Sequence, residues 1–110
     1  MDIEYFREYA LKKENSLECA PFGDDILVYK TGGKIFMMMN FNDPPEISLK
    51  CNPEYAVELR EKYNSVIPAY HMNKKHWNMI ILDGEVSSRE ILKMIDHSYE
   101  LIKKHLKKEK

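Results

Sequence analysis

Residues 70–77, YHMNKKHW, concentrate side chains that are able to bind ligands or transfer protons. Five of them have this capacity: His71, Asn73, Lys74, Lys75 and His76. Imidazoles ligate metals and act as acids and bases, whereas lysine ammonium groups and the asparagine amide donate hydrogen bonds to phosphate. The stretch therefore admits four interpretations, which are a metal site, a catalytic site, a phosphate-binding loop and a simple turn.

Neither a metal site nor a catalytic site fits the spacing of these residues. His71 and His76 are five positions apart, and neither His97 nor His105 adds a ligand at the offsets that zinc motifs use. The sequence contains no C-x-x-C, H-E-x-x-H or G-x-S-x-G motif. We therefore expect a protein without enzymatic activity, metal or cofactor. A metal or small-ligand site between this loop and the last helix remains open as an alternative.

Phosphate binding is the chemistry that suits the lysines of this stretch. Lys74 and Lys75 would contact backbone phosphates, and each such contact steepens the salt dependence of binding by about 0.9 in the logarithmic slope. We predict a nucleic-acid footprint formed by this loop and a neighbouring hairpin: Lys30, Lys34, Lys50, His71, Asn73, Lys74, Lys75 and His76. The alternative for the loop is a solvated turn at Asn73-Lys74 whose histidines form local hydrogen bonds.

The charge balance restricts any such contact to a small area. The 110-residue chain has a formal net charge of −1. Its last eight residues, KKHLKKEK, contribute +4, which leaves −5 for residues 1–102. A protein that grips DNA over a broad face is usually more basic than this.

Length and hydropathy suit a single domain over residues 1–110. The N-terminus is charged from its second residue, and no apolar run reaches the roughly 18–20 residues of a membrane span. We therefore expect a cytoplasmic protein without membrane contact, as a monomer or weak homodimer. Cys19 and Cys51 have no close-spaced partner, so both thiols should be reduced.

Periodicity predicts three helices. Apolar spacing indicates the first over residues 2–13, and Asn52-Pro53 opens the second. The third follows the Ser87–Glu90 capping box and keeps its apolar period to Leu106. The lysine-rich residues beyond it, up to residue 110, are expected to fray.

Runs rich in β-forming residues predict five strands, at 26–31, 34–41, 46–51, 66–70 and 77–82. Gly32-Gly33 lies between the first two and supplies the positive φ angles of a tight hairpin. Residues 14–25 are expected to form a connection. The resulting order is helix, three strands, helix, two strands, helix. It favours an α+β two-layer sandwich with a mostly antiparallel sheet and helices on one face.

Strand alternation separates the three methionines at positions 37–39. Met38 must face away from Met37 and Met39, because successive side chains of a strand point to opposite faces. An exposed methionine at this place would favour a peptide-binding surface, since methionine adapts to irregular partners. Trp77 is expected to pack at the end of its strand.

Four blocks of the sequence resemble successive blocks of the MmcQ/YjbR family, from about residue 18 to residue 106. These blocks are PFGDDILVYKTGGKIF, ISLKCNPEYAVELREKY, IPAYHMNKKHWNMIILDG and LKMIDHSYELI. The HMNKKHW run is the most specific of them, because these residue types rarely occur in this order by chance.

The resemblance implies a small α+β domain with the element order given above. It also implies DNA binding, since the family is described as a "double-wing" domain in which a sheet and its hairpins meet the duplex. The same general fold is similar to that of secretion chaperones, which bind unfolded protein segments. We therefore predict a DNA-binding protein of low sequence selectivity, with a peptide-binding or protein-interaction module as the alternative.

Overall fold

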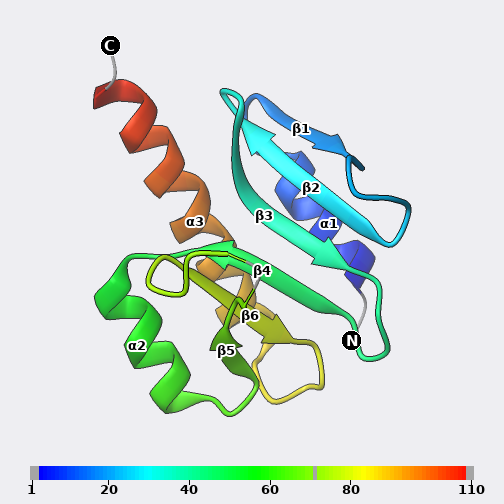
Figure 1. The fold of residues 1–110 in the computed structure, drawn as a ribbon, viewed down its shortest axis with the longest axis vertical. Helices are drawn as coiled ribbons and strands as arrows, with labels where there is room; N and C mark the ends of the chain where they lie inside the picture. The colour runs from blue at the N-terminus through cyan, green and yellow to red at the C-terminus, as the bar shows by residue number, and fades with distance from the viewer. Residues whose placement is uncertain (1–2, 71, 109–110) are drawn as a thin grey trace.

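This computed structural model describes residues 3–70 and 72–108, which form three helices and six strands (Figure 1). In chain order the elements are α1 (Ile3–Leu11), β1 (Ser16–Cys19), β2 (Ile26–Thr31), β3 (Lys34–Asn40), β4 (Glu46–Lys50), α2 (Pro53–Lys62), β5 (Val66–Pro68), β6 (Trp77–Ile81) and α3 (Ser88–Lys108). The predicted α+β sandwich with an antiparallel sheet is confirmed.

Helices α2 and α3 begin where their capping residues predict, whereas α1 ends at Leu11, two residues before the end predicted for it. The side chain of Asn52 accepts a hydrogen bond from the Glu54 N–H at 3.0 Å, and a proline occupies the first turn of α2. At the start of α3, the Ser87 hydroxyl oxygen accepts from the Glu90 N–H at 3.2 Å. The α3 backbone continues to Lys108, two residues past the predicted end, and residues 109–110 lie outside the described part.

The six strands of the described chain follow the order β1-β2-β3-β4-β6-β5, and all neighbours pair antiparallel. Strand β1 was not predicted, because residues 14–25 were assigned to a connection. Its Glu18 carboxylate accepts hydrogen bonds from Arg7 Nε at 2.7 Å and from the Tyr29 hydroxyl at 2.6 Å. These contacts from α1 and β2 hold an edge strand whose own sequence is too short to show a pattern.

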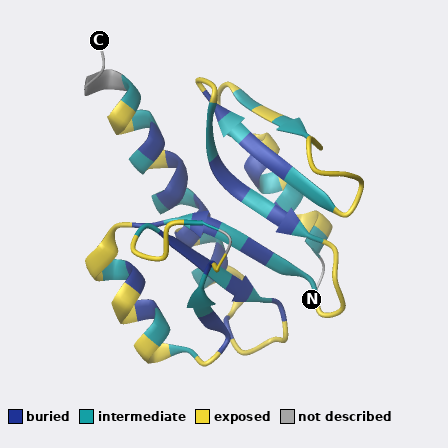
Figure 2. Cartoon of the chain, in the orientation of Figure 1, coloured by how far each residue is buried: buried dark blue, intermediate teal, exposed yellow. Residues whose placement is uncertain are grey.

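The hydrophobic core lies between the sheet and the helix layer. Tyr29, Met37 and Met39 point from the sheet into it and are fully buried. Each helix contributes to the same core, for example through Phe6, Ala56 and Ile95. Figure 2 shows the buried positions along the central strands and on the inner side of α3. All three helices therefore cover one face of the sheet, and the opposite face, here called the open face, carries no helix.

Within residues 3–70 and 72–108, we find no helix that is both long and apolar enough to cross a membrane.

Candidate binding site on the open face of the sheet

A groove of about 550 Å³ lies on the open face. Most of the residues that line it are apolar, and they come from four strands and three connecting segments: Phe22, Ile26, Ile35, Met38, Met39, Asn40, Asn42, Glu46, Ser48, Ala69, Tyr70, Met72 and Met79. Its size and its lining are those of sites that bind small ligands or short segments of a partner protein.

The floor of the groove is a row of cross-strand neighbours. The ladder pairs Met38 with Ser48 and Ser48 with Met79, so the two methionines flank a small polar residue on adjacent strands. Met38 and Met79 are both half-buried, whereas Met37 and Met39 are fully buried. The predicted separation of the three consecutive methionines is confirmed. Small Ser48 leaves a depression between two flexible apolar side chains.

Two aromatic side chains project beside this floor. Phe22, in the connection from β1 to β2, is 64% exposed, and Tyr70, after β5, is 62% exposed. Neither is needed to fill the core. Because exposed apolar side chains that gather around one concave surface mark contact sites, the groove has the character of such a site.

Ala69, Tyr70 and Met72, at the start of the connection from β5 to β6, form one wall of this groove. Ala69 N–H donates to the Trp77 carbonyl oxygen at 3.1 Å, and Met72 N–H donates to the Ala69 carbonyl oxygen at 3.0 Å. The segment then turns at Asn73, whose side-chain oxygen accepts from Lys75 N–H at 3.0 Å. The Asn73 carbonyl oxygen accepts from the His76 N–H at 3.1 Å. The turn predicted for Asn73-Lys74 is therefore present, and Asn73 uses its side-chain oxygen to form it.

Two residues outside the predicted footprint hold this turn in place. Arg60 Nη1 donates to Asn78 Oδ1 at 2.7 Å and to the Lys74 carbonyl oxygen at 3.4 Å. Asn78 Nδ2 in turn donates to the Ala56 carbonyl oxygen at 3.2 Å. Asn78 was visible in the sequence as a polar residue inside the apolar strand WNMIIL, where a buried amide requires hydrogen-bond partners.

The predicted footprint residues fall into groups. Lys74 and Lys75 are exposed on the turn, and the Lys74 ammonium lies 5.3 Å from the centre of the Tyr70 ring. Lys50 pairs with Trp77 in the ladder and so lies close to this turn. The His76 carbonyl oxygen, which accepts from the Cys51 N–H at 2.7 Å, ties the turn to the end of β4. The turn and Lys50 are thus brought together, while the predicted contact residue His71 lies outside the described residues.

The hairpin lysines are separated from each other by the sheet. Lys30 pairs with Ile35, which lines the groove, and therefore lies on the open face. Lys34 pairs with the buried Thr31 and lies on the helix side. The hairpin therefore offers the open face one lysine rather than two.

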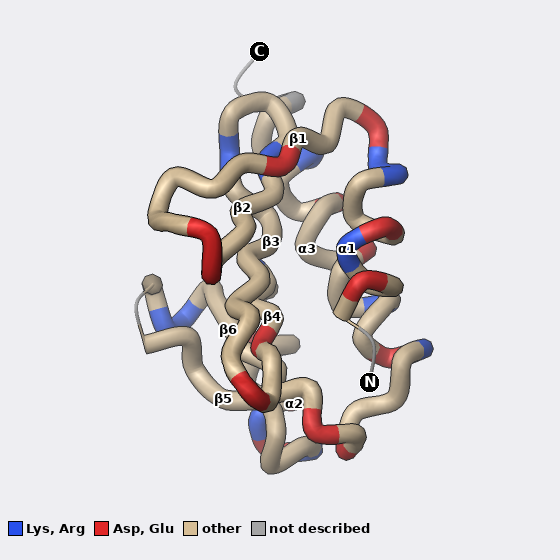
Figure 3. Tube along the Cα trace, turned by 90° about the vertical axis from the view of Figure 1, so that its right-hand side faces the viewer, with Lys and Arg blue, Asp and Glu red and all other residues tan. Residues whose placement is uncertain are grey.

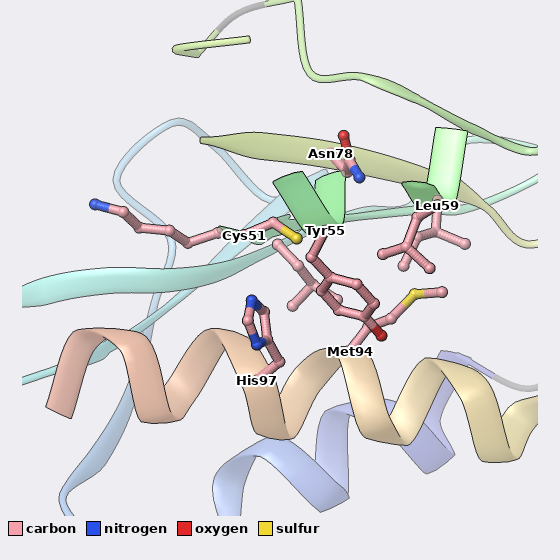
Figure 4. Close-up of a pocket in the computed structure, with 9 residues that line it drawn as sticks. Cys51, Tyr55, Leu59, Asn78, Met94 and His97 are labelled. Atoms are coloured by element: carbon pink, nitrogen blue, oxygen red, sulfur yellow. The ribbon is translucent and has the colours of Figure 1, made fainter. Parts of the chain in front are cut away.

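A second, much smaller cavity lies between the sheet, α2 and α3 (Figure 4). Here His97 Nε2 accepts a hydrogen bond from the Asn52 N–H at 3.1 Å. The Tyr55 and His97 rings pack edge to face, with their centres 4.7 Å apart. Burial raises the pKa of the Cys51 thiol to about 11 and lowers the pKa of His97. The thiol is therefore protonated at neutral pH, which makes it a poor nucleophile.

This second cavity is too small to bind a substrate. Its volume is about 10 Å³, which is the space of a single water molecule. Across the part of the chain that the structure describes, no three His, Cys, Asp or Glu side chains group together in a way that would bind a metal ion. The groove on the open face is therefore the stronger candidate for a binding site.

Three comparisons place the chain among known proteins. The family model YjbR matches residues 11–101. The protein YbdF of Escherichia coli O157:H7 is 39% identical over 85 residues, which cover 76% of this chain and 70% of YbdF. YjbR of Escherichia coli K12 is 38% identical over 64 residues, which cover 58% of this chain and 54% of YjbR. The names of these relatives state no activity and no ligand.

Solved structures agree with the fold. Protein DR2400 of Deinococcus radiodurans, which carries the family domain DUF419, superposes with a TM-score of 0.86 at 35% identity, covering 91% of this chain and 77% of that one. A Pseudomonas syringae protein superposes with a TM-score of 0.78 at 30% identity, covering 92% and 98% of the two chains. The match of the family model over most of the chain, together with these relatives, shows that the chain belongs to the YjbR family.

Proposed function

We propose that the protein is a non-catalytic interaction module that binds an apolar segment of a partner protein in the open-face groove. The observation that carries the proposal is the gathering of half-buried methionines and exposed aromatic rings around one concave surface of about 550 Å³. Burying such side chains under a partner is favourable by about 25 cal/mol per Å² of apolar area.

The composition of the groove supports a peptide ligand over a rigid small molecule. Met38, Met72 and Met79 all line it, and unbranched methionine side chains repack around ligands of different shape. Ser48, Asn40 and Asn42 add hydrogen-bonding groups of the kind that orient a bound peptide backbone. The groove lies within the face of the sheet rather than at its edge, so side-chain contacts and not strand addition would provide the affinity.

Nucleic-acid binding is the second candidate function. It is supported by the exposed Lys74 and Lys75 on a fixed turn next to Lys50, and by the description of the family. Against a broad duplex footprint stand the net charge of −1 and the position of Lys34 on the helix side. A duplex contact would therefore be small, with few phosphates neutralised and weak binding at physiological salt.

A peptide selection tests the proposed function. A displayed library of random peptides about a dozen residues long is selected on the wild type and on Met38→Asp, which places a charge on the groove floor. Val57→Asp is the matched control, because Val57 is an exposed apolar residue (44%) on α2. Circular dichroism and urea unfolding establish that each variant is folded.

The proposal predicts that the selected peptides have an apolar centre and bind the wild type and Val57→Asp equally. They should bind Met38→Asp at least tenfold more weakly, because binding would bury an uncompensated charge. Equal binding to all three proteins would contradict it. If double-stranded DNA binds the wild type and Met38→Asp equally well and no peptide is enriched, nucleic-acid binding is favoured instead.

A further inference from the structure

We infer that the segment bound in the groove is charge-polarised, with acidic residues at one end and basic residues at the other. The inference rests on the proposed function and specifies the chemistry of its partner. It follows from the separation of acidic and basic side chains at the two ends of the groove. Figure 3 marks charged positions along the tube, among them lysines on the connection between β5 and β6 and acidic residues on the connection between β1 and β2.

The first end of the groove is acidic. Glu46 begins β4, lines the groove and accepts a hydrogen bond from Asn42 Nδ2 at 3.2 Å. Asp43 lies between these two residues in the sequence and is exposed. The Asp25 carbonyl oxygen accepts from the Phe41 N–H at 3.0 Å, so the exposed 24–25 turn lies beside the same end of β3. Within the described residues, the loops at this end present no lysine or arginine.

The opposite end of the groove is basic. Lys50, which lines the small cavity on the helix side, ends β4 and pairs with Trp77. The backbone at this end of β4 therefore lies beside the turn that carries Lys74 and Lys75. The Lys74 ammonium lies over Tyr70, a groove residue, at 5.3 Å from the ring centre. This contact places the charge of Lys74 at the rim of the groove.

The two ends are far enough apart to act on different parts of one ligand. Glu46 and Lys50 are four residues apart on a strand, a distance of about 13 Å at 3.3 Å per residue. An extended peptide spans this distance with about four residues. At physiological ionic strength the Debye length is about 8 Å, so each end is felt mainly by the ligand charges nearest to it.

The consequence is a preference for the arrangement of charges rather than for their sum. A segment with glutamates at one end and lysines at the other would complement both rims in one orientation. A segment of the same composition with the charges interleaved would meet a like charge at each end. Each exposed ion pair between the ligand and the groove would contribute little to the free energy of binding, but several acting together orient a ligand.

The charge pattern of selected peptides tests the inference. The peptide library is selected on the wild type and on Lys74→Glu/Lys75→Glu, which reverses the two lysine charges of the turn at the basic end of the groove. The matched control is Lys103→Glu/Lys104→Glu, which changes the net charge equally on α3, the helix on the other face of the sheet. A peptide selected on the wild type is then synthesised, together with a version whose charged residues are interleaved.

We expect the peptides selected on the wild type to carry acidic residues at one end and basic residues at the other. Measured by fluorescence anisotropy at low salt, the selected peptide should bind Lys74→Glu/Lys75→Glu roughly tenfold more weakly than the wild type. The loss should be smaller at high salt, and the α3 control should bind the peptide almost as tightly as the wild type does. The interleaved peptide should bind the wild type several-fold more weakly.

Two results would overturn the inference, and they are distinguishable. If selected peptides depend on Met38 but show no segregated charges and bind both lysine variants equally, the groove binds its ligand without charge polarity. If no peptide depends on Met38, the proposed function fails and this inference fails with it.

Discussion

The Arg60 guanidinium donates a hydrogen bond to the Asn78 side-chain oxygen at 2.7 Å and thereby joins α2 to β6. The same guanidinium reaches the Lys74 carbonyl oxygen, so one side chain fixes both the strand and the turn before it. Asn78 completes the link by donating to the Ala56 carbonyl oxygen. The wall of the groove is thus held from behind the sheet, by residues that do not line the groove.

Replacing Asn78 by alanine should therefore destabilise the fold by about 2 kcal/mol, because it leaves the buried Ala56 carbonyl oxygen without this donor and Arg60 without this acceptor. Urea unfolding measures the free energy of unfolding. Asn42→Ala is the control, since that amide is exposed, and its cost should stay below about 0.5 kcal/mol. If Asn78→Ala lowered the free energy of unfolding by no more than this small control value, the Arg60–Asn78–Ala56 link would add no measurable stability.

The stability of the fold should also depend on the protonation of His97. Its pKa is lowered by burial, so the unfolded chain takes up the proton at a higher pH than the folded protein does. Neutral His97 therefore stabilises the fold fully above the ordinary histidine pKa of 6.5. This stabilisation is lost as the pH falls through the lower pKa that His97 has in the folded state.

Unfolding in urea between pH 7.5 and pH 5 checks this expectation. The wild-type free energy of unfolding should fall over this range, and His97→Gln should show a flatter profile because it removes the titrating group while keeping a hydrogen-bond acceptor. A wild-type slope in His97→Gln would mean that another group titrates.

The second candidate function makes its own prediction about salt. If the turn contacts phosphate, Lys74→Ala/Lys75→Ala should weaken binding to a short DNA duplex. The slope of log affinity against log salt should then fall by about 0.9 for each phosphate that the variant no longer neutralises. Lys62→Ala/Lys93→Ala removes the same charge from α2 and α3 and serves as the control. An unchanged slope in the Lys74/Lys75 variant would remove these two lysines from any nucleic-acid footprint.

The elements that follow from local rules could be predicted from the sequence. Capping at Asn52 and Ser87, the Gly32-Gly33 hairpin and the alternation around Met38 each depend on residues close together in the chain. The burial of Trp77 was also expected from its place at a strand end and is confirmed at 7% exposure.

What depends on distant contacts could not be predicted. Strand β1 is held by Glu18 through contacts with α1 and β2, and the four residues of β1 alone show no pattern. The groove arises only when the connection containing Phe22 and the segment containing Tyr70 flank the same face of the sheet. The charged residues of the 71–76 loop formed the predicted site, whereas the apolar neighbours Tyr70 and Met72 are the residues of this stretch that line the groove.

The central claim, that the open face binds an apolar segment, is tested most directly by methyl NMR of protein labelled at its methionines. A peptide selected on the wild type is titrated into the sample, and the methyl signals are followed. Met38, Met72 and Met79 should shift in proportion to occupancy, while Met37 and Met94, buried in the core between sheet and helices, should stay in place. Shifts confined to other residues, or none at the three groove methionines, would contradict the account.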